Sequence, residues 1–198
     1  MKKILSLTIA LLVSITLFAQ NADFQKAVAK YKNVSSLTAT AVRTTHKAGT
    51  ANDKSVSGKL YVKKPSKVLI QNGKDALLMN GTSFTMKKGA LKAKTDSKKD
   101  NQYNTFHDVL ESIFSGGATD ISKLSDVKMS KSGSNVIITI TPVPQAKKRM
   151  MFSSFILTID GKAQELRSIR LVKKAGAYTE YVFSNYKLGA SVADSQFK

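Results

Sequence analysis

Residues 56–88 read VSGKLYVKKPSKVLIQNGKDALLMNGTSFTMKK, and this stretch decides the fold. Its segments are short, rich in apolar or β-branched residues, and separated by turn signals at Pro65, Asn72–Gly73 and Asn80–Gly81. Within residues 56–63, apolar residues and one glycine alternate with polar residues. This alternation is typical of an antiparallel sheet with one face packed and the other solvated.

The period of two extends to both sides of this stretch. Asp160–Gly161 is a further hairpin signal. About ten or eleven strands are predicted, which indicates an α+β protein built on one large, curled antiparallel sheet. Besides the segments in residues 56–88, the predicted strands are 36–45, 127–132, 135–143, 150–160, 164–174 and 177–188.

Two segments have the period of an amphipathic helix instead. In residues 23–33, the apolar positions are Phe24, Ala27, Val28 and Tyr31. In residues 105–117, TFHDVLESIFSGG, an apolar stripe ends at Gly116–Gly117, and Asn104 or Thr105 is predicted to cap the start. We expect these two helices to cover the concave face of the sheet, with one more helical turn at residues 119–124.

The first twenty residues have the pattern of a secretory signal peptide. Lys2 and Lys3 precede a mostly apolar run from Ile4 to Phe18, and cleavage is predicted near Ala19–Gln20. The run is shorter than the roughly 20 residues that a transmembrane helix needs. No cysteine follows it, so no lipid can be attached there. We expect a soluble periplasmic protein with one domain over residues 21–198.

The chain is strongly basic, with 32 Lys plus Arg against 13 Asp plus Glu in 198 residues and a formal net charge of +19. Only four of the basic residues are arginines, and the lysines are spread along the chain in pairs such as Lys87–Lys88. Base and phosphate recognition favours the planar guanidinium group. The pattern therefore indicates a solvated surface and argues against a nucleic-acid partner.

The sequence carries no recognisable enzymatic motif. It lacks cysteine, has two histidines, and contains no GxSxG, HExxH, GxxxxGK[ST] or GxGxxG pattern. We expect His46 and His107 to be surface or rim residues, and no predicted strand face carries two carboxylates. We interpret the chain as a non-enzyme without metal or cofactor; a secreted hydrolase lacking a known motif is a remote alternative.

Several segments resemble the periplasmic outer-membrane lipoprotein carrier proteins, the LolA-like family. FQKAVAKYKNVSSLTATA resembles the family's first helix and first strand, and SGKLYVKKPSK resembles its strand and basic-basic-proline turn. DALLMNGTSFTMKKGALK resembles the hairpin that follows. NVIITITPVPQAKKRMMFSSFILTIDGKAQELRSIRL resembles the late hairpin.

The resemblance implies an incomplete β-barrel closed by helices around an apolar cavity. In the family, this cavity takes lipoprotein acyl chains released by an inner-membrane transporter, and the carrier delivers them to an outer-membrane receptor. It also implies that Lys64, at a position where the family usually has arginine, acts as a latch on the lid helices. This lysine and the absence of tryptophan are departures from the family pattern, so the cargo can differ from the usual one.

The candidate cavity residues come from the predicted strands and the second helix. From the residues alone, they form an ordinary core as readily as an adaptable lipid cavity, and both interpretations stay open. A different function class, an exported basic module that binds an anionic membrane surface or a polyanionic glycan, is the main alternative to a monomeric lipid carrier. The predicted cavity residues are Leu60, Val62, Ile70, Met79, Phe84, Met86, Phe106, Leu110, Ile113 and Phe114.

Overall fold

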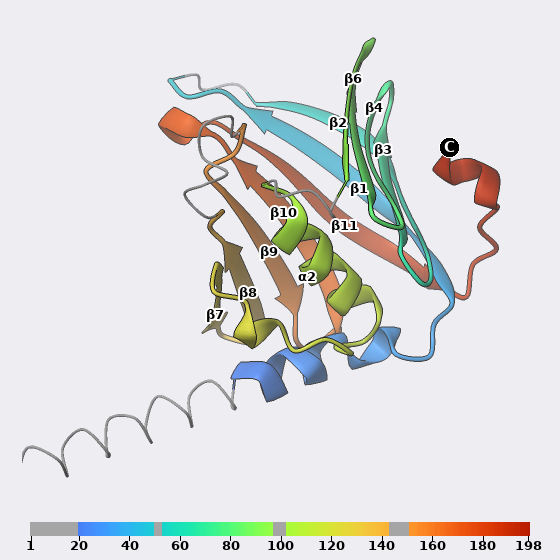
Figure 1. Ribbon diagram of the computed structural model, residues 1–198, viewed down its shortest axis with the longest axis vertical. Helices are drawn as coiled ribbons and strands as arrows, with labels where there is room; N and C mark the ends of the chain where they lie inside the picture. The colour runs from blue at the N-terminus through green and yellow to red at the C-terminus, as the bar shows by residue number, and fades with distance from the viewer. Residues whose placement is uncertain (1–19, 50–52, 97–101, 143–150) are drawn as a thin grey trace, which may run out of the picture.

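The computed structural model describes residues 20–49, 53–96, 102–142 and 151–198. In this part of the chain, eleven strands form one antiparallel sheet in the order β6-β5-β4-β3-β2-β1-β11-β10-β9-β8-β7 (Figure 1). The strands are β1 (Ser36–His46), β2 (Lys54–Lys63), β3 (Lys67–Asn72), β4 (Asp75–Asn80), β5 (Ser83–Lys88), β6 (Leu91–Asp96), β7 (Val127–Ser132), β8 (Asn135–Ile140), β9 (Ser154–Asp160), β10 (Glu165–Val172) and β11 (Tyr178–Leu188).

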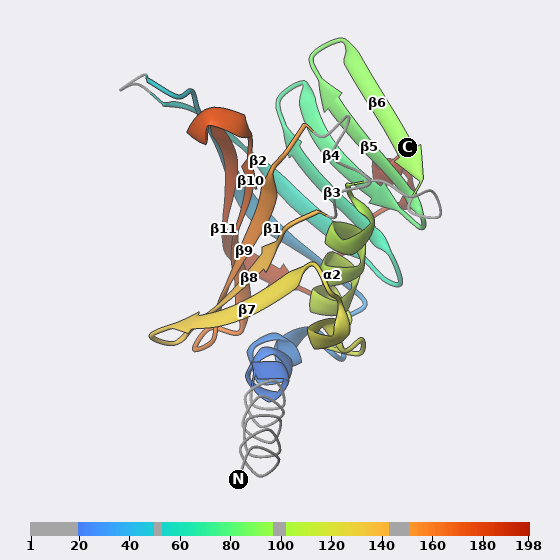
Figure 2. The same ribbon diagram turned by 60° about the vertical axis from the view of Figure 1, so that its left-hand side comes forward.

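The sheet is an incomplete barrel whose two edges are joined by a helix. Strands β6 and β7 are the edges, and the chain passes between them through α2 (Asn104–Phe114) and the 3-10 turn η2 (Ile121–Lys123). Figure 2 shows the sheet curling around α2, which lies on its concave side. The predicted α+β class and the incomplete barrel are therefore confirmed.

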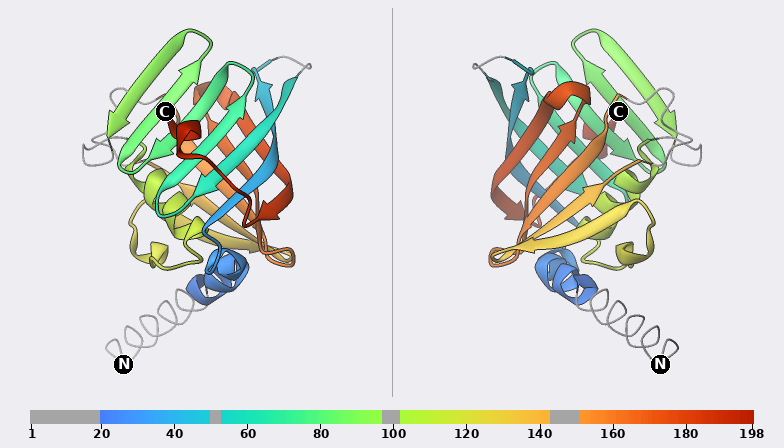
Figure 3. Two further views of the ribbon diagram at one scale, coloured as in Figure 1. Left: turned by 90° about the vertical axis from the view of Figure 1, so that its right-hand side faces the viewer. Right: turned by 90° about the vertical axis from the view of Figure 1, so that its left-hand side faces the viewer.

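A second helical segment lies across one end of the curled sheet (Figure 3). Residues 20–28 are helical and continue into the 3-10 turn η1 (Ala29–Tyr31). The four apolar residues predicted for its inner face, Phe24, Ala27, Val28 and Tyr31, are all buried. The helix begins no later than residue 20, before the predicted start at residue 22 or 23.

The predicted cap of α2 is wrong. The residue preceding the helix is Tyr103, and no side chain caps the helix there. The Thr105 hydroxyl instead donates a hydrogen bond to the Asp126 carboxylate at 2.6 Å. The Thr105 side chain therefore makes a tertiary contact with the segment before β7 and does not cap the helix.

The predicted strand 127–132 has the bounds of β7, and the turn signals at Asn72–Gly73 and Asn80–Gly81 lie where β3 turns into β4 and β4 into β5. Strand β6 was not predicted, because its sequence LKAKTD looks like a polar connection. It pairs with β5 and forms an edge of the sheet, where solvated lysines discourage pairing with other chains. The end of the predicted strand 135–143 and the start of 150–160 lie partly outside the described residues.

The sheet bends where β1, β2 and β3 meet. At Gly58, a Cβ atom would lie 2.0 Å from the backbone oxygen of Gln71, so only glycine fits this position. The Asn72 side chain reaches across the bend and donates hydrogen bonds to the carbonyls of Ala41 at 2.8 Å and Val56 at 3.0 Å. The turn signal at Asn72–Gly73 thus also marks a buried side chain that joins three strands.

The C-terminal tail packs on the convex side of β3 and β4 (Figure 3). Its last turn, η5 (Asp194–Phe197), places Phe197 against Leu69 and Leu78. The Lys67 ammonium group donates to the Asp194 carboxylate at 2.7 Å. The tail therefore covers an apolar patch on the outer face and leaves the concave face to the helices.

The predicted signal peptide, residues 1–20, lies almost entirely outside the described residues. Its cleavage and the boundary of the mature domain stay predictions. Of the helices that the structure does describe, none has the length and apolar character needed to cross a bilayer.

Candidate functional site

The concave face of the sheet and the two helices enclose the candidate site. Side chains alternate across a strand, so every second residue of β2 to β5 points toward α2. The ten predicted cavity residues all join one apolar cluster there; nine are buried, and Met86 is partly buried against them. The structure brings the predicted set together, with the helices packed directly on the apolar face.

An aromatic group lies under the N-terminal half of α2. The rings of Phe84 and Tyr103 stack with centroids 4.5 Å apart, and those of Phe106 and Phe155 stack at 4.8 Å. Phe152 contacts both Phe155, at 5.6 Å, and Tyr103, at 6.4 Å. Sequence reasoning missed Tyr103, Phe152 and Phe155 as site residues, although Phe155 begins the alternation of apolar residues along β9.

The N-terminal helical segment is attached to the sheet at its C-terminal end through Lys64. The Lys64 ammonium group, just after β2, donates hydrogen bonds to the carbonyls of Tyr31 at 2.7 Å and Lys32 at 2.8 Å. Carbonyls at the end of a helical turn carry partial negative charge, which a cation stabilises; the Tyr31 carbonyl also accepts a hydrogen bond from the Val34 amide at 3.2 Å. Burial lowers the pKa of Lys64 below its usual range.

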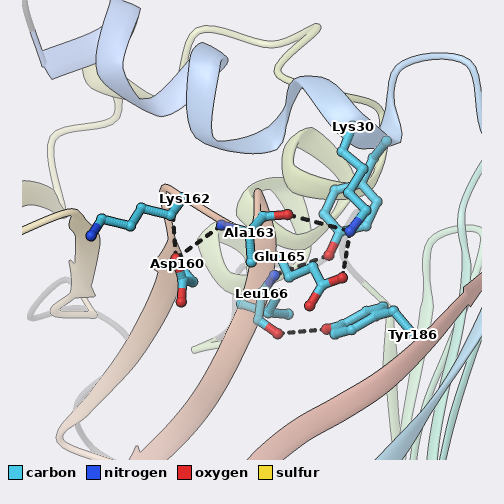
Figure 4. A network of polar contacts seen from close by, with 8 residues as sticks. Lys30, Asp160, Lys162, Ala163, Glu165, Leu166 and Tyr186 are labelled. Carbon is cyan, nitrogen blue, oxygen red and sulfur yellow. Dashed lines mark hydrogen bonds and ion pairs between the residues drawn. The ribbon is translucent and has the colours of Figure 1, made fainter.

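A second attachment joins the same segment to the β9–β10 hairpin (Figure 4). The Leu166 amide donates to the Tyr31 hydroxyl at 3.0 Å, and the Tyr186 hydroxyl donates to the Leu166 carbonyl at 2.5 Å. Lys30 bonds to the Glu165 carboxylate and donates to the Ala163 carbonyl at 3.3 Å. Burial raises the pKa of Tyr31 to about 12, so the hydroxyl stays protonated.

The two covering helices touch each other at Gly116. A Cβ atom on Gly116 would lie 2.6 Å from the Cα atom of Lys32, and one on Gly117 would lie 3.1 Å from the side chain of Gln25. Both glycines have positive φ, at 79° and 81°. The Gly116–Gly117 pair therefore ends α2, as predicted, and also allows the N-terminal segment to approach it closely.

Comparison with protein families identifies this architecture. The profile described as "Outer membrane lipoprotein carrier protein LolA" matches residues 32–198. The chain belongs to the LolA family. The match begins just after the N-terminal helical segment, so that segment, quoted above for its resemblance, lies outside it.

Solved structures similar to this LolA-family chain are distant in sequence. A LolA superfamily protein from Nitrosomonas europaea is 10% identical with a TM-score of 0.41, over 89% of this chain and 96% of the other. LprF from Mycobacterium bovis is 13% identical with a TM-score of 0.37, over 88% and 95%. The lipoprotein LppX from Mycobacterium tuberculosis is 14% identical with a TM-score of 0.36, over 88% and 97%. None of the curated proteins compared with the chain matches it.

His107 corrects the expectation that both histidines of this LolA-family chain lie at the surface or rim. It is buried, because α2 is packed between the sheet and the turn that joins β4 to β5. Its Nε2 atom lies 2.8 Å from the Gly81 carbonyl, to which it donates, and its Nδ1 lies 3.1 Å from the Asp108 carboxylate. His46 is half-exposed at the end of β1, stacked on Tyr178 at 4.8 Å.

Among the described residues, one group of side chains has the donor types of a metal site. Ligand atoms of His107, Asp108 and Glu111 lie within 4.8 Å of one another. The Nε2 atom of His107 is engaged by Gly81 and its Nδ1 faces Asp108 within the same cluster. The imidazole therefore acts as a link between α2 and the sheet, and the geometry gives no support for a metal site.

Proposed function

We propose that this LolA-family protein binds the acyl chains of lipoproteins, or of related lipids, between the concave face of its sheet and the two helices. The observation that supports this most is a continuous apolar interior face covered by two short helical segments. The proposal extends to an exported, monomeric, non-enzymatic carrier formed by residues 21–198 after signal cleavage. Its partners would be an inner-membrane lipoprotein-releasing transporter and an outer-membrane receptor.

The energetics of acyl-chain burial require that the helices occupy the binding face when no lipid is present. Burying one CH₂ group contributes about 0.8 kcal/mol, so one sixteen-carbon chain contributes on the order of 12 kcal/mol. Two such chains would exceed the practical limit of about 18–21 kcal/mol for non-covalent affinity. Displacing packed helices offsets part of this gain and leaves the cargo releasable.

The contacts of the N-terminal segment suit it to be displaced. Its polar attachments are concentrated in a few side chains, chiefly Lys64, Tyr31 and Lys30. The first of these is the latch implied by the family resemblance, although its bonds go to the end of the N-terminal segment and not to α2. Displacing the segment would break these bonds, remove its buried apolar side chains from the interior and expose Phe114, whose ring lies 5.4 Å from that of Tyr31.

The test of the carrier function is native mass spectrometry of detergent-free protein, followed by lipid extraction. Co-purifying diacyl or triacyl species, displaced by added lipopeptide, are expected. A variant with Leu110→Gln places an amide on the apolar face and should lose lipid, whereas Glu111→Gln, on the next residue of the helix, should retain it. Lipid-free protein that also fails to take up lipopeptide would contradict the proposal.

The second candidate, a basic module for anionic surfaces, is supported by the many solvated lysines. Its binding would weaken steeply between low and high salt because exposed charges are screened. Acyl-chain binding depends on apolar burial, so its affinity should change little between low and high salt. Lipopeptide binding measured at two ionic strengths therefore separates the two functions.

A further inference from the structure

A small cavity opens at the end of the interior opposite the N-terminal segment. The contacts of Lys64 place the N-terminal segment near the start of β1. The cavity lies near the end of the same strand, at Arg43 and Thr45. Its volume is about 220 Å³. Its apolar lining is Met86, Met151, Phe152, Leu171 and Tyr181.

At this cavity the interior face of the sheet changes from apolar to cationic. Residues two apart on a strand share a face. Lys88 lies two positions after Met86 of β5, and Lys173 lies two positions after Leu171 of β10. On β1, buried Ala41 is followed by Arg43. Each of the three strands therefore places a cation at the mouth of the cavity, directly beyond the last apolar residue on its interior face.

The carboxylate at the cavity is already committed to other groups. Asp75 bonds to the Arg43 guanidinium, and its Oδ1 accepts a hydrogen bond from the Gly89 amide at 2.7 Å. These bonds, Arg43 first, hold the pKa of Asp75 below its usual range. The buried Nε of Arg43 has no hydrogen-bond partner among the described residues.

The two lysines make no direct ion pair among the described residues, although the nearby charge of Lys88 helps to lower the pKa of Asp75. In the part of the chain that the structure describes, the ion pairs include neither Lys88 nor Lys173. Burial and the nearby charge of Lys88 both lower the pKa of Lys173. Two cations from different strands thus face one polar opening, and an anion between them would relieve their repulsion.

The size of the cavity limits what it can hold. At about 220 Å³ it is smaller than the 300–1,000 Å³ of common ligand pockets, so it suits a headgroup and not an acyl chain. Phe152, which lines it, contacts Phe155 at 5.6 Å. Phe155 in turn stacks on Phe106 of α2, so a series of aromatic contacts, which an entering chain would have to displace, joins the mouth to the interior beneath the helix.

We propose that this mouth is an anion subsite, built from Lys88, Lys173 and Arg43, that holds the phosphate or carboxylate headgroup of an amphiphile whose chain runs inward past Phe152. The chain-binding half of this statement rests on the proposed function. The anion-binding half rests on the mouth alone.

The test compares three probes by calorimetry below the concentration at which they form micelles: decyl phosphate, decanol and inorganic phosphate. Decyl phosphate should bind the native protein more tightly than either of the others. Lys88→Gln combined with Lys173→Gln should weaken decyl phosphate at least about ten-fold and leave decanol unchanged. The control, Lys59→Gln with Lys187→Gln, removes the same charge from exposed positions on β2 and β11 and should bind as the native protein does.

The outcomes separate failure of the subsite from failure of the carrier function. If the affinity for decyl phosphate fell equally in both double variants, or fell in neither, the anion subsite would be overturned. Lysine-dependent binding of decyl phosphate with no binding of decanol would keep the subsite and argue against acyl-chain capture. If inorganic phosphate bound as tightly as decyl phosphate, the proposal of an amphiphilic ligand would be overturned, and the site would be one for free phosphate. Unchanged unfolding curves would show that all variants are folded.

Discussion

Three single residues influence how the sheet bends and how it is covered. Gly58 allows β2 and the end of β3 to approach closely, and the Asn72 amide satisfies two backbone carbonyls at the same bend. Lys64 satisfies two carbonyls at the end of the N-terminal segment. Gly58 works by leaving room for the backbone of β3, whereas Asn72 and Lys64 work by donating hydrogen bonds to backbone carbonyls.

Gly58→Ala should destabilise the protein by about 1–3 kcal/mol, because the new methyl group would meet backbone atoms that have little room to move. Urea unfolding measures the loss. Ser57→Ala, at the exposed neighbouring position of the same strand, is the control and should change stability little. Equal stability of the two variants would show that the bend is not constrained at Gly58.

Lys64→Leu should loosen the N-terminal segment, because two carbonyls lose their cationic donor. Amide hydrogen exchange of residues 20–31 is expected to speed up, with a loss of about 1 kcal/mol in global stability for these partly solvated bonds. Lys64→Arg should restore slow exchange, and Lys59→Leu on the solvated face of β2 should leave it unchanged. If exchange of residues 20–31 is the same in Lys64→Leu as in the native protein, the latch is ruled out.

At the scale of elements, the two covering helices depend on each other and on the sheet. The end of α2 contacts the N-terminal segment at Gly116, and His107 links α2 to the β4–β5 turn. Such short helices are marginal in isolation and gain stability mainly from packing. They are therefore suited to move together if one is displaced.

Gly116→Ala should push the N-terminal segment away from α2, because the added Cβ would lie 2.6 Å from the Cα of Lys32. Faster amide exchange in residues 20–31 and a lower free energy of unfolding are expected. Gly133→Ala separates this clash from backbone strain, since Gly133 also has a positive φ, 60°, but has nothing near its Cβ position. A loss of stability in Gly116→Ala no larger than in Gly133→Ala, with unchanged exchange, would argue against coupling of the helices.

At the scale of the whole molecule, charge and apolar surface are segregated. Most buried apolar residues lie on the concave side, apart from the patch under the C-terminal tail, whereas lysines are frequent on the convex face, at the β6 edge and at the mouth. Exposed ion pairs contribute little to stability. The net charge of +19 is therefore better explained by solubility and by attraction to anionic partners than by the fold.

Alkaline pH should destabilise the protein through its buried tyrosines. Burial raises the pKa of Tyr31, Tyr103 and Tyr181 to about 12 each, whereas in the unfolded chain it is about 10. Between these values the folded state binds more protons, so stability falls as pH rises, by about 1.4 kcal/mol per pH unit for each tyrosine. Urea unfolding between pH 9 and 12 measures this slope.

Tyr181→Phe should make that slope shallower by the contribution of one group. In the native protein, the absorbance of these buried tyrosines should titrate only near pH 12, where the loss of stability levels off. An unchanged slope in the variant would mean that Tyr181 does not hold its proton preferentially in the folded state.

The sequence by itself determined most of the strands, both helical faces and many of the interior residues, because these follow from periods of two and 3.6 residues read locally. The identities of Leu60 and Phe106 as interior residues needed only that pattern. The local pattern failed where a distant contact decides the conformation. Strand β6 is a strand only because β5 pairs with it, and His107 is buried only because the β4–β5 turn packs over α2.

Only the tertiary structure decided where the N-terminal segment is attached and which glycine lets the two helices approach each other. It also decided that Lys88 and Lys173 face one opening. The residues that form these contacts lie up to 135 positions apart in the sequence, as Tyr31 and Leu166 do. A sequence period reports which face a residue occupies, but it carries no information on which strands the curled sheet brings together. That pairing is fixed by the closure of the barrel around α2, and with it the cationic mouth.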